Sequence, residues 1–102
     1  MGEFVTIGNA DALGENEMTA FQVGPRRIAV ARVAEAFYAF DDICTHAACS
    51  LADGDLEDGT VVCPCHYGVF DLSTGKVVDG PPPSPVGVYP VRIVEGELRV
   101  EV

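Results

Sequence analysis

The two short segments Cys44-Thr45-His46 and Cys63-Pro64-Cys65-His66 decide how this sequence of 102 residues is interpreted. They contain both histidines of the chain, and all four cysteines lie between positions 44 and 65. Each segment offers a thiolate and an imidazole at short spacing, so two tight loops can present four ligands to one metal centre. Core packing does not require such a concentration of metal-binding residue types. We therefore predict a metal site with four protein ligands: Cys44, His46, Cys63 and His66.

Two cysteines and two histidines suit two kinds of metal centre. One is tetrahedral zinc, and the other is an iron–sulfur cluster in which histidines replace two of the cysteines. A zinc finger with this ligand set usually groups a cysteine pair before a histidine pair. Here each segment supplies one residue of each type, as Cys-x-His and then Cys-x-x-His. The ligand types alone leave both metals open.

This arrangement resembles the Rieske motif, and the similarity extends to Pro64 and to the proline run Pro81-Pro82-Pro83. In the Rieske family one iron is held by two cysteines and the other iron by two histidines. The resemblance therefore implies one 2Fe–2S cluster of the Rieske type. It also implies which residues bind each iron: Cys44 and Cys63 the first, His46 and His66 the second.

The resemblance also implies roles for residues outside the four ligands. In Rieske proteins a proline-rich loop covers the cluster, which implies this role, in place of a simple linker, for residues 80–85. Cys49 and Cys65 are not ligands in this motif. The Rieske proteins of respiratory cytochrome bc complexes carry a cysteine at both positions and join the two. We therefore expect a Cys49–Cys65 disulfide, against the alternative of two small buried side chains.

Composition and patterning predict an all-β fold. Eleven glycines and seven prolines favour many short strands joined by turns over long helices. Alternating apolar residues near the C-terminus predict a hairpin around Glu95-Gly96 that has one inward face and returns to the N-terminal sheet. We expect strands at residues 4–7, 18–23, 27–33, 37–40, 60–62, 69–72, 77–78, 89–93 and 98–102. The resemblance implies one Rieske domain over residues 1–102, an antiparallel barrel or sandwich with a small cluster-binding subdomain inserted at about 42–80.

The charge and hydropathy of the chain exclude several partners. Sixteen acidic residues against six basic ones give a formal charge of −10, whereas nucleic-acid binding needs a basic surface. No apolar run approaches the ~20 residues that cross a bilayer. No export signal is recognisable at the N-terminus. We therefore expect a cytoplasmic protein that binds neither nucleic acid nor membrane.

The predicted site suits electron transfer and no bond chemistry. Both histidines are committed to metal, so no serine or cysteine has a histidine left to activate it. A small Rieske protein without an oxygenase domain resembles the ferredoxin of a multicomponent aromatic-ring dioxygenase. The resemblance implies a one-electron carrier, not an enzyme, between a flavin-dependent reductase and a terminal oxygenase. The alternatives are the small Rieske-like subunit of an assimilatory nitrite reductase and a zinc-stapled binding module.

Gly68 and Phe70, which follow His66 by two and four residues, bear on the reduction potential. Respiratory Rieske proteins have a serine and a tyrosine where this sequence has Gly68 and Phe70, and those hydroxyls donate hydrogen bonds toward the cluster sulfurs. Such donors favour the reduced cluster because it carries one more negative charge. Their absence predicts a potential near the low end of the Rieske range, even with a disulfide of the respiratory type.

Overall fold

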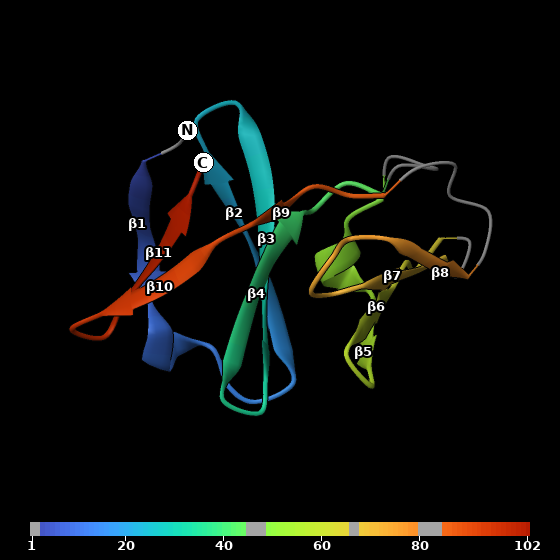
Figure 1. Cartoon of the computed structure of the whole chain (residues 1–102), viewed down its shortest axis with the longest axis horizontal. Coiled ribbons are helices and arrows are strands. Elements are labelled where there is room, and N and C mark those ends of the chain that lie inside the picture. Colours follow the sequence, from blue (N-terminus) through green and yellow to red (C-terminus); the bar gives the residue numbers. More distant parts are fainter. Residues whose placement is uncertain (1–2, 45–48, 66–67, 80–84) are drawn as a thin grey trace.

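The computed structural model describes residues 3–44, 49–65, 68–79 and 85–102, and in these ranges the chain consists mainly of short antiparallel strands (Figure 1). The expected all-β fold is confirmed. Apart from strands, these ranges contain two single turns of 3-10 helix, and no helix in them is long and apolar enough to cross a membrane. In chain order the elements are β1 (Phe4–Asn9), η1 (Ala10–Ala12), β2 (Glu17–Val23), β3 (Arg26–Val33), β4 (Ala36–Asp41), η2 (Leu51–Asp53), β5 (Asp55–Glu57), β6 (Thr60–Val62), β7 (Val69–Asp71), β8 (Val77–Asp79), β9 (Val88–Tyr89), β10 (Val91–Val94) and β11 (Glu97–Glu101).

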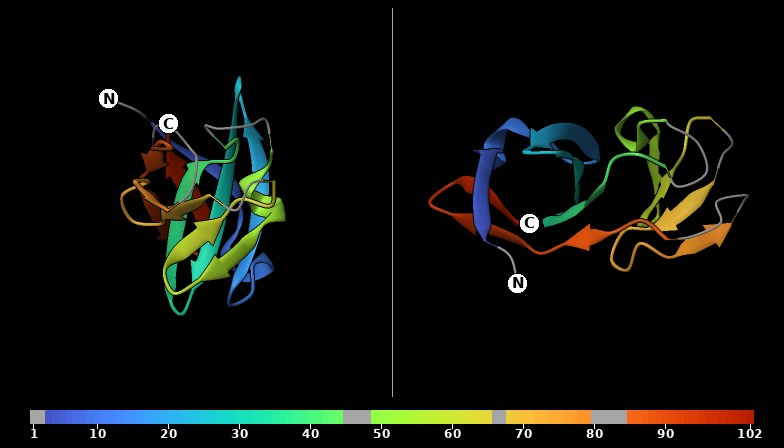
Figure 2. Two further views of the ribbon diagram at one scale, coloured as in Figure 1. Left: turned by 90° about the vertical axis from the view of Figure 1, so that its right-hand side faces the viewer. Right: turned by 90° about the horizontal axis from the view of Figure 1, so that it is seen from above.

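The described strands form three antiparallel sheets. Two of them, ordered β1-β11-β10 and β2-β3-β4-β9, lie together at one end of the molecule, here called the barrel (Figures 1 and 2). The third, ordered β5-β6-β7-β8 and here called the small sheet, lies at the other end. The last strand returns to the first, with Val100 opposite Val5, as the alternating C-terminal pattern predicted. The proposed limits of the cluster-binding subdomain stay a prediction.

Strand β3 lies between two apolar cores. Its residues from Ile28 to Ala31 are all fully buried, and successive side chains of a strand point to opposite sides. Ile28 and Val30 pack in the barrel core, together with Leu13, Ala39, Leu98 and Val100. The smaller Ala29 and Ala31 face a second core, which includes Phe40, Cys44, Leu51, Val61, Cys63 and Phe70. The second core joins the barrel to the small sheet, so the cysteine-bearing loops rest on the same packed layer as β3.

The C-terminal hairpin has the predicted turn, but its strand β10 is less buried than the pattern predicted. Glu95 and Gly96 both have positive φ, 51° and 80°, as a two-residue hairpin turn requires. On β11 the predicted inward residues are buried, including Leu98. On β10 the side chain of Ile93 is 42% exposed. Strand β10 is the edge of its sheet, and among the described strands only β11 pairs with it, which leaves Ile93 less covered.

The residue after η2 is a glycine, Gly54, and the sequence pattern does not show why. The φ of Gly54 is −90°, a value open to any residue, so the backbone conformation alone does not require glycine. A Cβ atom added to Gly54 would lie 1.9 Å from the carbonyl oxygen of Val62 on β6. The glycine therefore permits a close approach between the two segments. Gly59, in the β5–β6 turn, has φ +80° and open space around its missing Cβ.

Replacement of Gly54 by alanine should destabilise the fold much more than replacement of Gly59. Gly54→Ala forces two backbone segments apart, which costs about 3 kcal/mol. Gly59→Ala places alanine in the left-handed region, which costs about 1 kcal/mol. The unfolding temperature should therefore fall by about 12 °C or more for Gly54→Ala and by about 4–8 °C for Gly59→Ala. Equal decreases in the two variants would show that Val62 does not confine this position.

Candidate metal centre

Two loops follow strands β4 and β6, and each begins at a buried cysteine and is closed in the same way. The backbone N–H of Cys44 donates to the carbonyl of Cys49, with 3.0 Å between nitrogen and oxygen. The backbone N–H of Cys63 donates to the carbonyl of Gly68, at 2.8 Å. Donor and acceptor lie five positions apart in both loops. The sequence predicted two tight loops, and each is closed by an equivalent main-chain hydrogen bond.

The structure brings the two predicted cysteine ligands into one core. Cys44 is 4% exposed and Cys63 is 1% exposed, and neither belongs to a disulfide. Both pack in the core that connects the barrel with the small sheet. Leu51 lies in the same core and Leu56 packs against it.

The other predicted parts of the site lie outside the described residues. These parts are His46, His66 and most of the proline-rich stretch, residues 80–84. Among the residues that the structure describes, no three His, Cys, Asp or Glu side chains form a group that could hold a metal. The histidine ligands and the covering loop therefore stay predictions.

The predicted disulfide between Cys49 and Cys65 is present and links the two loops. The Cα atoms of the two cysteines are 6.4 Å apart, within the usual range for a disulfide. Cys49 ends the first closed loop and Cys65 lies within the second. The disulfide therefore restrains the two loops relative to each other, while Cys44 and Cys63 are buried in one core and do not belong to it.

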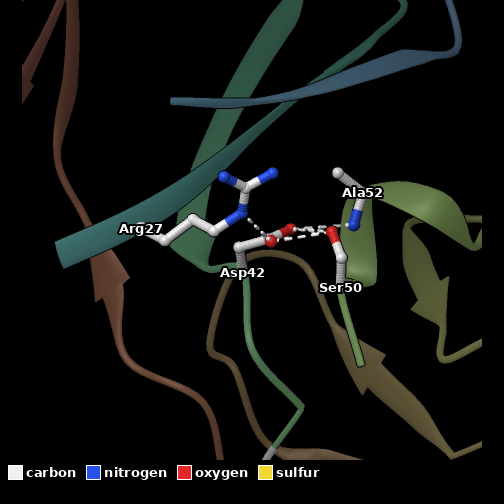
Figure 3. A network of polar contacts seen from close by, with 4 residues as sticks. All are labelled: Arg27, Asp42, Ser50 and Ala52. Atoms are coloured by element: carbon white, nitrogen blue, oxygen red, sulfur yellow. Dashed lines mark hydrogen bonds and ion pairs between the residues drawn. The ribbon is translucent and has the colours of Figure 1, made fainter. Parts of the chain in front are cut away.

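A buried carboxylate fixes the base of the first loop, and the sequence reasoning did not assign it a role (Figure 3). Asp42 is fully buried and forms an ion pair with the half-exposed Arg27 of β3, with 2.8 Å between Nε and Oδ2. The hydroxyl of Ser50 and the backbone N–H of Ala52 donate to the same carboxylate. A sequence signal existed: the β3–β4 hairpin, in which Ile28 pairs with Asp41, places the cationic Arg27 opposite the anionic Asp42.

The preceding carboxylate, that of Asp41, holds the strand that returns from the proline-rich stretch. It accepts hydrogen bonds from the hydroxyl of Tyr89 and from the backbone N–H of Gly87. Arg26 donates to the same Tyr89 hydroxyl, with 3.0 Å between Nη1 and the oxygen. Burial and the hydrogen bond to Asp41 raise the pKa of Tyr89, so its phenol stays protonated and can donate. Adjacent carboxylates therefore fix two different segments next to the candidate site.

Fold and site together define a class of small antiparallel β proteins in which two cross-linked loops each begin at a buried cysteine. Residues 3–90 match the family described as Rieske [2Fe-2S] domain. This match covers most of the chain, and the chain belongs to the Rieske family. Its cofactor is one 2Fe–2S cluster of the Rieske type.

Individual proteins of known sequence or structure agree with this assignment. The anthranilate 1,2-dioxygenase ferredoxin subunit of Burkholderia cepacia is 39% identical over 102 residues, which is 100% of this chain and 94% of that protein. A chain from a complex of reduced oxygenase and oxidized ferredoxin in carbazole 1,9a-dioxygenase is 34% identical and superposes with a TM-score of 0.89, covering 96% of this chain and 92% of the other. A nitrite reductase small subunit from Mycobacterium tuberculosis reaches a TM-score of 0.90 at 21% identity, covering 100% of this chain and 96% of that one, and shares the fold.

Alkylation of the denatured protein tests the disulfide directly. Of the four cysteines two are bridged, so two thiols should react without reductant and four after reduction. Mass analysis of the peptides should place the two labels at Cys44 and Cys63. The paired variant Cys49→Ala/Cys65→Ala should still bind iron. It should lose the iron faster on mild heating, because a bridge over a loop of this length contributes about 3 kcal/mol in the chain-entropy model. Labelling of Cys49 and Cys65 in intact, unreduced protein would refute the bridge.

Proposed function

We propose that this protein is the ferredoxin of an aromatic-ring-hydroxylating dioxygenase system. It accepts one electron from a flavin-dependent reductase, carries it on its cluster and delivers it to a terminal oxygenase. The observation that carries this proposal is the similarity over the full chain to a ferredoxin subunit of a dioxygenase. The likeness to a chain solved in a complex of an oxygenase with a ferredoxin supports the same partner. The cytoplasmic location expected from the sequence belongs to this proposal.

The ligands that we propose for the cluster are Cys44 and Cys63 on one iron and His46 and His66 on the other. The residues that the structure describes fit this group. Two buried thiols at the starts of two facing loops supply the sulfur donors, and the other two cysteines are bridged to each other and so cannot compete. The expected histidines follow their cysteines by two and three positions within the same loops.

The bound cluster supplies a site that takes up and releases one electron. The contribution of the protein is to hold this site without rearrangement. The amides of Cys44 and Cys63 are engaged in loop-closing hydrogen bonds, and the disulfide limits the separation of the loops. The apolar core behind the cysteines keeps water away from the thiolate side. These features suit a carrier that acts on no substrate of its own.

The nitrite reductase alternative has weaker support. The small subunit with the same fold is only 21% identical, so that likeness carries no functional argument. The similarity to dioxygenase ferredoxins is higher in sequence and extends along the whole chain. The dioxygenase system is therefore the function that we adopt.

An acidic edge on the small sheet gives the carrier a surface for encounter with a basic partner. Residues 53–58, from the end of η2 through β5 to the next turn, contain four exposed acidic side chains: Asp53, Asp55, Glu57 and Asp58. The formal charge of the chain is −10. Opposite charges accelerate the association of two proteins, and salt screens this effect.

Reduced protein should transfer electrons to the terminal oxygenase of a ring-hydroxylating system, and the rate should fall as salt rises. The Debye length shortens from about 30 Å at 0.01 M to about 8 Å at 0.15 M, so the guidance by acidic side chains weakens. Stopped-flow measurement of cluster oxidation after mixing gives the rate directly. Absence of transfer to any such oxygenase, with rapid transfer to a nitrite reductase, would reverse the assignment.

Two sets of variants provide the controls for this measurement. Cys44→Ser and Cys63→Ser should lose the cluster and all transfer, because each removes a proposed ligand. Asp55→Asn/Glu57→Gln should slow transfer at low salt. Glu95→Gln/Glu97→Gln makes the same charge change on the β10–β11 hairpin, at the barrel end of the molecule (Figure 1). It should leave the rate near that of the wild type, whereas an equal effect of both pairs would show that only net charge matters.

The reduction potential should lie near the low end of the Rieske range of about −150 to +300 mV. Phe70 is fully buried in the core beside the cysteines and has no hydroxyl to offer a cluster sulfur. Phe70→Tyr should raise the potential by up to about 85 mV, the equivalent of one charge-assisted hydrogen bond of ~2 kcal/mol. Phe37→Tyr, which adds the same hydroxyl next to the barrel core, should leave the potential unchanged.

Voltammetry at neutral pH measures each of these potentials. A value above about +150 mV in the wild-type protein would contradict the prediction and point to the respiratory class.

A further inference from the structure

We infer that Asp42 is a positioning residue for the metal centre, because its buried carboxylate locks the first ligand loop onto the barrel. This inference rests on the proposed function, since it takes Cys44 as a cluster ligand. Asp42 is 0% exposed. No other polar or charged side chain in the ranges that the structure describes is buried. It lies two positions before Cys44.

Both carboxylate oxygens of Asp42 are fully engaged (Figure 3). Oδ2 accepts from Nε of Arg27 at 2.8 Å and from the hydroxyl of Ser50 at 2.7 Å. Oδ1 lies 2.8 Å from the same hydroxyl and accepts from the backbone N–H of Ala52 at 2.9 Å. The partners come from two directions: Arg27 from the barrel strand β3, and Ser50 with Ala52 from the far end of the loop.

Main-chain hydrogen bonds also connect Asp42 with β3 and with the far end of the loop. The backbone N–H of Asp42 donates to the carbonyl of Arg27 at 3.0 Å, and the backbone N–H of Leu51 donates to the carbonyl of Asp42 at 2.6 Å. Ile43 and Ser50 form an isolated antiparallel bridge one position further along. Both ends of the segment that contains Cys44 and Cys49 are thereby joined to each other and to β3. The loop cannot shift against the barrel unless several of these bonds break.

A charge at this position indicates a role in geometry more than in overall stability. The removal of a carboxylate and a guanidinium from water costs free energy that their attraction only partly returns. Apolar residues of similar volume would often stabilise the fold as well. They would not impose directions, whereas two oxygens with four hydrogen-bonding contacts set the orientation of the loop. The directional contacts keep Cys44 in place with respect to the second loop.

Loss of the cluster to a chelator provides the test, because the loop must open before iron can leave. In iron-loaded Asp42→Asn, which loses the ion pair with Arg27 but keeps a side chain of the same shape, the rate of loss of visible absorbance should rise about tenfold. Asp71→Asn is the matched control. The Asp71 carboxylate also accepts several hydrogen bonds, from Ser73 and Thr74, but Asp71 is the last residue of β7 and pairs with Thr60, three positions before Cys63. That variant should retain the lifetime of the wild type.

A second measurement separates positioning from general destabilisation. The g values of the reduced cluster should change in Asp42→Asn and stay unchanged in Asp71→Asn, because only the first variant frees the ligand loop. Ser50→Ala, a milder change, should shorten the cluster lifetime in the same direction and serves if Asp42→Asn does not fold. In a double-mutant cycle, Arg27→Gln should add little to Asp42→Asn, since both remove the same ion pair.

Three outcomes would overturn the inference, and one of them also reaches the proposed function. Equal cluster lifetimes in Asp42→Asn and Asp71→Asn would contradict the role of Asp42 while leaving the cluster intact. A faster loss that merely follows a lower unfolding temperature, with unchanged g values, would reduce Asp42 to a structural residue. A wild-type protein that binds no iron would reject the proposed metal centre itself.

Discussion

Two main-chain hydrogen bonds, from Cys44 to Cys49 and from Cys63 to Gly68, determine the geometry of the site. Each joins the two ends of a loop at a buried cysteine and so restrains the direction in which the loop leaves the core. The small sheet delivers the second loop from the end of β6, and the barrel delivers the first from the end of β4. The disulfide and the Asp42 contacts then limit what motion remains.

The apolar core that contains Cys44 and Cys63 holds the two loops in a fixed position against the barrel. Strand β3 presents alanines to that core and larger side chains to the barrel core. The small residues leave room for Phe40, Leu51 and Phe70 to pack between β3 and the loops. Interiors packed in this way deform little, so movement of the barrel is transmitted to the loops and not absorbed between them.

The sequence predicted the parts of the molecule that follow short-range rules. Alternating apolar residues predicted most of the strands, and Glu95-Gly96 predicted the C-terminal hairpin turn, in which both residues have positive φ. The metal-binding motif predicted Cys44 and Cys63 as a pair of ligands, and these two cysteines share one core. The resemblance to Rieske proteins predicted the Cys49–Cys65 disulfide. The contacts of Asp42 could not be read from local pattern, because they depend on which residues of a distant segment meet the end of β4. The exposure of Ile93 and the close approach at Gly54 likewise depend on tertiary neighbours.

Burial divides the four cysteines into two chemical pairs. Cys65 is exposed and Cys49 half-buried, whereas Cys44 and Cys63 are shielded almost completely. An oxidant that approaches from solvent therefore reaches Cys65 and Cys49 first, and these are the two cysteines that form the disulfide. The sulfurs of Cys44 and Cys63, which we propose as the thiolate ligands, are reached last. The same arrangement discourages mispaired disulfides during maturation of the protein, because the chain conformation itself selects which thiols are within reach of oxidation.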